Sequence, residues 1–293
     1  MWRSPRSEDF PSRLWQASME ETMQLAVEAN ERFLNTAAPR AAADWDSLLA
    51  YQVDLAFPQE LKFLVSLKAW RDATCVLDAG CGNGYYLSRL HEFFPEKRYF
   101  GVDISPELVA IAARRHPEIA VTMSDFIKYA PNCRFDLIVM RFFVQHLKDF
   151  GAILQAADRL LAPEGRLLII ESDLAASGHH PDLPALTEML LTFARVSGEQ
   201  GAIKPRLLAD ADRLVRETNP RWSVEHQESI ANPQVGPFGG SKLLAVYQLW
   251  IDLCERSNMF RFDFDRVRDE LERWSRDPAT FSNVALRMIL MGR

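Results

Sequence analysis

CVLDAGCGNG, residues Cys75 to Gly84, joins a strand-like run to a glycine-rich turn. Its first three residues are apolar and suit a buried strand, and Gly80, Gly82 and Gly84 let the backbone turn sharply and approach a ligand where side chains would block it. Residues Tyr85 to Phe94 are predicted to form the helix that follows. The stretch therefore predicts a ligand-binding loop between a strand and a helix of an α/β sheet.

The glycine spacing separates two classes of ligand. A helix N-terminus after a glycine turn attracts phosphate, and dinucleotide-binding proteins use this geometry with the spacing GxGxxG. Here the spacing is GxGxG, and a carboxylate, Asp78, stands at the end of the strand. Because a carboxylate repels pyrophosphate and attracts positive charge, the loop favours a ligand such as S-adenosylmethionine, with its ammonium and sulfonium groups.

On these residues the chain resembles the class I S-adenosylmethionine-dependent methyltransferases of the small-molecule type. Their first motif is an acidic residue followed by GxGxG, which Asp78, Gly80, Gly82 and Gly84 match. The resemblance implies an α/β fold with a doubly wound, Rossmann-like, mostly parallel seven-stranded sheet, and S-adenosyl-L-methionine as the cofactor. It also implies that Asp78, Gly80, Gly82 and the neighbouring Asn83 contact that cofactor.

Later segments extend the resemblance in the expected order. Residues 98–104, RYFGVDI, are predicted as a second strand that ends in Asp103, roughly 20 residues past the glycine turn, where an acidic side chain can hold ribose hydroxyls. Ile104 follows it as a further expected cofactor contact. Ser105 is the predicted N-cap of a helix that begins at Pro106.

The third strand is expected at Val121 to Asp125. The resemblance implies that Asp125 lies near the adenine amino group and that Phe126 packs close to the ring. A fourth, largely apolar strand, FDLIVM, is typical of a central parallel strand covered on both faces, and Arg141 and Phe142 follow at its carboxyl end, where open α/β sheets bind ligands.

The last segment of the predicted core is Leu160 to Asp173, LLAPEGRLLIIESD. It is expected to contain a helix end, a turn at Pro163 to Gly165 and a fifth strand. Five ordered motifs over residues 75–173 are hard to explain as unrelated α/β scaffolding, although each motif alone would fit that interpretation.

The regions that flank this core are predicted to be helical. Residues 1–70 form an expected N-terminal helical segment, with one amphipathic helix through Glu20 to Leu34 and one or two more over Asp44 to Ala69. In the resembling family such a segment often closes over the cofactor. Tyr51 is placed among the expected cofactor contacts for this reason, and packing on the core is the alternative for this side chain.

A second helical region interrupts the final edge of the sheet. Residues 223–230 and 284–291 are predicted as the sixth and seventh strands, yet about 50 residues separate them where a hairpin needs only a few. Between them, residues 241–256 and 264–276 have helical apolar spacing, and Asn232 to Gly240 is the expected hinge. The core is thus predicted as residues 71–235 and 282–293, and residues 236–281 as an insertion that is either a lid or a dimerisation element.

Composition bears on partners and location. The formal net charge is −6, and because no dense lysine or arginine cluster stands out, a nucleic-acid partner is disfavoured. No apolar run reaches the roughly 18 residues of a membrane span, and the N-terminus lacks the apolar core of a secretory signal. The four cysteines form no CxxC pair, which favours a cytoplasmic location and argues against a zinc site.

The expected chemistry is in-line displacement of an activated methyl group, for which alignment alone can supply roughly 7–11 kcal/mol. A base is needed only for a protonated acceptor, and His146, close to the expected cofactor edge, is the candidate, with a packing role as the alternative. We expect an enzyme that methylates a small, apolar or aromatic metabolite. Two alternatives stay open: a protein that binds S-adenosylmethionine without methyl transfer, as a rearrangement catalyst or sensor, and a protein or peptide methyltransferase. The accepting atom and a homodimeric state are also open.

Overall fold

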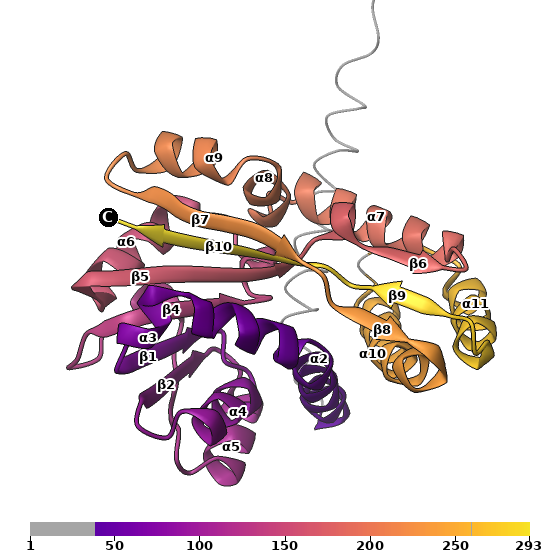
Figure 1. Ribbon diagram of the computed structural model, residues 1–293, viewed down its shortest axis with the longest axis horizontal. Helices are drawn as coiled ribbons and strands as arrows, with labels where there is room; N and C mark the ends of the chain where they lie inside the picture. The colour runs from indigo at the N-terminus through magenta and orange to yellow at the C-terminus, as the bar shows by residue number, and fades with distance from the viewer. Residues whose placement is uncertain (1–38, 259) are drawn as a thin grey trace, which may run out of the picture.

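A seven-stranded sheet forms the centre of the fold. The computed structural model describes residues 39–258 and 260–293, so the helix predicted over Glu20 to Leu34 lies outside the described residues. The strands of the sheet are β1 (Cys75–Ala79), β2 (Arg98–Asp103), β3 (Ala120–Met123), β4 (Phe135–Arg141), β5 (Leu161–Ser172), β7 (Ser223–Ile230) and β10 (Leu286–Gly292). Their order across the sheet is β3-β2-β1-β4-β5-β10-β7 (Figure 1).

The strand directions confirm the predicted fold class. Strands β1 to β5 pair in parallel, and β10 pairs antiparallel with both β5 and β7. Alternate residues of β4 enter different apolar clusters, with Leu137 and Val139 on one face and Ile138 and Met140 on the other. Both faces of this strand are therefore covered, which explains its continuous apolar sequence.

The two faces of the sheet are covered by helices from different parts of the chain. The helices around the sheet are α2 (Pro39–Ser66), α3 (Lys68–Asp72), α4 (Tyr85–Phe93), α5 (Pro106–Arg115), α6 (Phe150–Leu160), α8 (Lys204–Ala209) and α9 (Ala211–Thr218). Short 3₁₀ turns follow three strands: η1 (Phe126–Lys128), η2 (Val144–His146) and η3 (Leu174–Ala176). The Ser105 side chain accepts from the backbone N–H of Leu108, as the predicted N-cap requires.

A second, smaller layer lies beside the carboxyl ends of the parallel strands (Figure 1). It contains a three-stranded antiparallel sheet in the order β6-β9-β8, made of β6 (Gly178–His180), β8 (Pro233–Val235) and β9 (Phe281–Asn283). It also contains α7 (Pro184–Glu199), α10 (Gly236–Ser257) and α11 (Phe264–Arg276). These helices share one apolar cluster, which extends the packed region beyond the predicted insertion to α7.

Several predicted local structures are corrected. The expected hinge at Asn232 to Gly240 is wrong, because Pro233–Val235 pairs with β9 and α10 begins at once at Gly236. The expected turn at Pro163 to Gly165 lies inside β5, where the pairing with β4 jumps from Phe135↔Leu161 to Leu137↔Arg166. The predicted third strand ends at Met123 and not at Asp125, because the Asp125 carboxylate caps η1.

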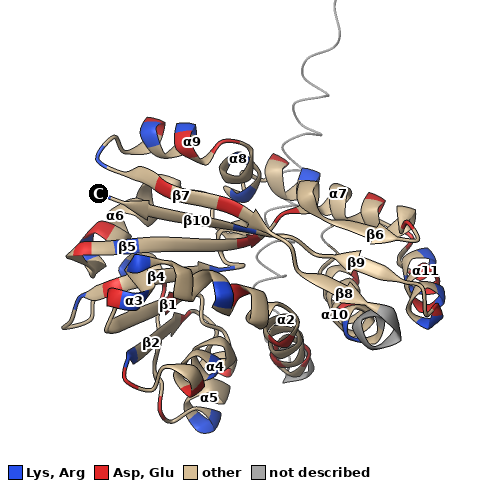
Figure 2. Ribbon diagram, in the orientation of Figure 1, with Lys and Arg blue, Asp and Glu red and all other residues tan. Residues whose placement is uncertain are grey.

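The described residues, 39–258 and 260–293, form helices that carry charges of both signs (Figure 2). No helix there is both long enough and apolar enough to cross a bilayer. Figure 2 shows basic and acidic residues side by side on α9 and α11, where Arg213 pairs with Glu217 and Arg276 with Glu272. These cations are therefore compensated on their own helices.

Candidate cofactor and acceptor site

The glycine turn is held by the end of the neighbouring strand. Gly80, Gly82 and Gly84 have φ angles of 80°, 53° and 73°, in the left-handed region that glycine adopts without strain. The N–H of Gly82 donates to Asp103 Oδ2 at 2.9 Å, so β2 fixes the turn that follows β1. A Cβ at Gly82 would lie 2.5 Å from Leu49 Cδ1, which shows how closely α2 packs on the loop.

One cavity of about 500 Å³ opens at the carboxyl ends of β1, β2 and β4. This volume lies in the range of about 300–1,000 Å³ that small-ligand sites have. The lining comes from the glycine loop, the ends of these strands and helices α2, α5, α7 and α10. The lining residues used below are Trp45, Leu48, Leu49, Gln52, Gly80, Gly82, Asp103, Ile104, Asp125, Phe126, Arg141, Phe142, Gln145, His146, Phe193 and Trp250.

At one end of the cavity, acidic and apolar side chains alternate. Asp103 Oδ1 accepts from the N–H of Ser105 at 2.8 Å, so its carboxylate is oriented by the backbone on both sides. Burial raises the pKa of Asp103, and the N–H donors of Ser105, Gly82 and Ile104 oppose that rise. Asp125 Oδ1 accepts from the N–H of Ile127, and Phe126 is buried beside it.

Three predicted cofactor contacts do not line the cavity. Asp78 is 2% exposed, and its Oδ1 has no hydrogen-bond partner among the described residues. Asn83 is turned toward α2, where its Nδ2 donates to the backbone oxygen and to Oδ1 of Asp46. Tyr51 is 44% exposed, because the cavity face of α2 contains positions 45, 48, 49 and 52 and Tyr51 lies outside that stripe.

Arg141 lines the cavity and forms a buried ion pair that the sequence did not indicate. Its Nε lies 3.0 Å from both carboxylate oxygens of Glu60, and its Nη2 donates to the backbone oxygen of Gln52 at 3.0 Å. The guanidinium carbon lies 4.4 Å from the ring centroid of Phe142, which has a left-handed φ of 51°. Burial raises the pKa of Asp78 to about 7; the Arg141 charge opposes this rise, and Asp103 and Glu60 add to it.

The other end of the cavity is aromatic. Trp45 comes from α2, Phe193 from α7 and Trp250 from α10. The rings of Phe193 and Trp250 meet edge to face with centroids 4.9 Å apart. Gln52 and Gln145 are neutral hydrogen-bonding groups on the same lining, so the cavity combines aromatic surface with uncharged polar groups.

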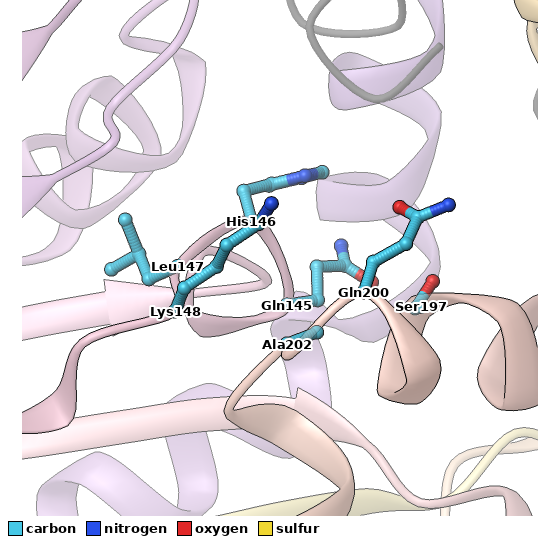
Figure 3. Close-up of a pocket in the computed structure, with 7 residues that line it drawn as sticks. All are labelled: Gln145, His146, Leu147, Lys148, Ser197, Gln200 and Ala202. Carbon is cyan, nitrogen blue, oxygen red and sulfur yellow. The ribbon is translucent and has the colours of Figure 1, made fainter. Parts of the chain in front are cut away.

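His146 stands between this cavity and a small polar pocket. The pocket holds about 10 Å³, room for about one water molecule, and it is lined by Gln145, His146, Lys148, Ser197 and Gln200, with Leu147 and Ala202 (Figure 3). Burial, together with the positive charge of Lys204, lowers the pKa of His146 to about 4. The imidazole is therefore neutral near pH 7.

These residues fit S-adenosylmethionine. Asp103 ends a parallel strand with its carboxylate aligned by backbone donors, as a ribose-binding acid requires, and both of its oxygens keep a further lone pair. Ile104 and Phe126 add apolar surface to the same lining as the polar groups Asp103 and Asp125. The cavity therefore offers a slot for a nucleoside and space beyond it.

The methyltransferase domain family matches residues 77–167, which contain the glycine loop, Asp103, Asp125 and Arg141. This match supports the predicted resemblance to the class I S-adenosylmethionine-dependent methyltransferases. Proteins of this family depend on S-adenosylmethionine, which confirms the predicted cofactor class.

Named relatives share this methyltransferase domain. The malonyl-[acyl-carrier protein] O-methyltransferase of Hahella chejuensis is 33% identical over 132 residues, 44% of this chain and 45% of that protein. The trans-aconitate 2-methyltransferase of an Azoarcus species is 36% identical over 98 residues, 33% of this chain and 39% of that protein. The chain thus spans less than half of the length of these two relatives.

A solved structure shares the fold over a longer stretch than the methyltransferase domain alone. Phospholethanolamine N-methyltransferase 2 of Haemonchus contortus aligns with 89% of this chain and 59% of its own, with a TM-score of 0.52 and 17% identity. At this identity the likeness concerns the fold alone.

Proposed function

We propose that this chain is an enzyme that binds S-adenosylmethionine and transfers its methyl group to a small, apolar or aromatic acceptor. The observation that carries the proposal is the single cavity that joins the glycine loop and Asp103 to the aromatic wall of Trp45, Phe193 and Trp250. A nucleoside cofactor and an acceptor would lie end to end in it. Methyl transfer needs the accepting atom to lie next to the methyl group of the cofactor, and this arrangement would allow it.

We further propose specific cofactor contacts. The Asp103 carboxylate accepts hydrogen bonds from the ribose hydroxyls. Each charge-assisted hydrogen bond contributes about 1.5–3 kcal/mol to the binding free energy. Asp125 and Phe126 hold the adenine edge and ring, with Ile104 on the rim. Gly80, Gly82, Arg141 and Phe142 supply the walls of the cofactor site.

The mechanism follows from alignment. The bound cofactor supplies a methyl group that is already activated as a sulfonium, so this chain's residues mainly position and enclose the acceptor. Helices α2, α7 and α10 shield the reacting end from water, and fixed geometry lowers the barrier by up to about 7–11 kcal/mol. Where the acceptor is protonated, His146 is the candidate base, because its neutral ring lines the cavity and can accept a proton.

The helical region over residues 236–281 is proposed as part of the acceptor wall. Trp250 from α10 lines the cavity, and α10 also packs against α2 and α11. A role in a homodimer is the alternative. All four cysteines are free thiols, which supports the proposed cytoplasmic location.

Calorimetry with S-adenosylhomocysteine, followed by incubation with methyl-labelled S-adenosylmethionine and a metabolite panel, tests this function. Labelled product together with S-adenosylhomocysteine is the expected result. Conversion of a metabolite without S-adenosylhomocysteine would indicate use of the cofactor as a fixed charge, and label on proteins alone would indicate a protein methyltransferase. Absence of binding would refute the proposal.

A further inference from the structure

We infer that the acceptor end of the cavity takes an uncharged aromatic molecule and selects against a carboxylate, in contrast to the acids in the names of the two relatives above. The inference rests on the proposed function and specifies its acceptor class. It follows from the ion pairs and positions of the cations near this end of the cavity.

Arg141 is the one lysine or arginine among the described residues that line the cavity. Its charge is compensated by Glu60, which is fully buried and contacts both Nε and Nη2. Asp78 is also buried, and the charge of the same guanidinium opposes the rise of its pKa. A carboxylate that entered the cavity would therefore meet a cation that already has a partner.

Two lysines lie near His146, Lys204 and Lys148. Lys204 already has an acidic partner, and Lys148 lines a different pocket. Lys204 Nζ lies 3.1 Å from Glu171 Oε2, whose side chain is fully buried, and donates to Ser172 Oγ at 2.8 Å. Lys148 is exposed and lines the small pocket together with His146 (Figure 3). Neither lysine lines the larger cavity.

The groups that do line the acceptor end suit an uncharged ring. Phe193 and Trp250 both line the cavity and meet each other edge to face, and this aromatic surface favours contact with a flat aromatic molecule. The Gln145 side chain donates to the backbone oxygen of Phe142 at 3.0 Å, which fixes its amide and leaves its oxygen to accept from a hydroxyl. A hydroxyl needs one such partner, whereas a desolvated carboxylate needs a cation or several donors.

The test uses two fragments with the same ring and different charge, 2-naphthol and 2-naphthoate. Each is titrated by calorimetry near neutral pH into protein saturated with S-adenosylhomocysteine, which has no sulfonium and so reports on this chain's own residues. We expect 2-naphthol to bind at least about tenfold more tightly, a difference of about 1.4 kcal/mol. Gln145→Arg, which adds a cation to the lining, is expected to raise the affinity for 2-naphthoate at least about tenfold.

Lys148→Met is the matched control, because it removes a cation that the inference places outside the acceptor site. It should leave both affinities unchanged. Equal or tighter binding of 2-naphthoate by the unaltered protein, loss of that binding in Lys148→Met, or failure of both fragments to bind would each overturn the inference. A protein that does not bind S-adenosylhomocysteine would instead refute the proposed function.

Discussion

Replacement of Glu60 by glutamine tests the buried ion pair beneath the cavity. The substitution keeps the shape of the side chain but leaves the Arg141 side chain, which is 5% exposed, without its carboxylate partner. Breaking a buried pair by removing one partner typically costs about 3–5 kcal/mol. Asp78 stands beside the same guanidinium and takes over part of the compensation, so we expect a loss near the lower limit, about 3 kcal/mol.

Urea unfolding followed by circular dichroism measures this loss. Glu199→Gln is the matched control, because Glu199 pairs with Arg195 on the surface, with side chains 61% and 62% exposed, and such pairs contribute about 0.3–0.5 kcal/mol. The double variant Glu60→Leu with Arg141→Met should regain most of the stability, since an apolar pair needs no compensation. A loss below about 1 kcal/mol in Glu60→Gln would show that the pair is not desolvated as described.

Three further outcomes are expected. Asp103→Asn should weaken S-adenosylhomocysteine binding by about 10–100-fold in calorimetry, because it removes the charge from two hydrogen bonds; unchanged affinity would exclude a ribose contact. The Asp78 carboxyl keeps its proton to about pH 7 in the folded chain, against a usual pKa of 3.8, so the unfolding free energy should fall as pH rises from about 4 to 7. Asp78→Asn should reduce this pH-dependent fall in unfolding free energy by up to about 4 kcal/mol, measured by urea titrations at several pH values. The same pH dependence in the variant and the parent would contradict the prediction. His146→Ala should lower turnover about 10²-fold, and the parent enzyme should lose activity only as pH falls to about 4, where His146 becomes protonated. Normal turnover of the variant at every pH would remove His146 from the mechanism.

The sequence predicted the parts of the fold that depend on local patterns. The glycine turn, the apolar strand FDLIVM and the Ser105 cap are each specified by residues close together in the chain, and all three are present. The placement of Asp103 at the glycine loop was predicted by its position after a strand, because parallel strands end at one edge of a sheet.

What the sequence could not indicate depends on distant residues or very short elements. Glu60 and Arg141 are 81 positions apart, and nothing in either segment marks them as partners. Strands β6, β8 and β9 have three residues each, too few to show a period of two. The predicted helix over Asp44 to Ala69 did not define which of its faces would meet the cavity, so the contact expected of Tyr51, which is 44% exposed, stays a prediction.

The attachment of α2 to the glycine loop has a consequence for how ligands enter and leave the cavity. Asp46 holds Asn83, Leu49 covers Gly82, and Glu60 holds Arg141, so this helix is fastened at three levels along the site. Swinging it aside would break the buried pair, and a cost of about 3 kcal/mol would make such an open state about 10²-fold rarer. Cofactor exchange is thus expected at the rim of the cavity that contains Ile104, which is 67% exposed. Helix α2 would then stay in place as a fixed wall that positions each ligand that enters.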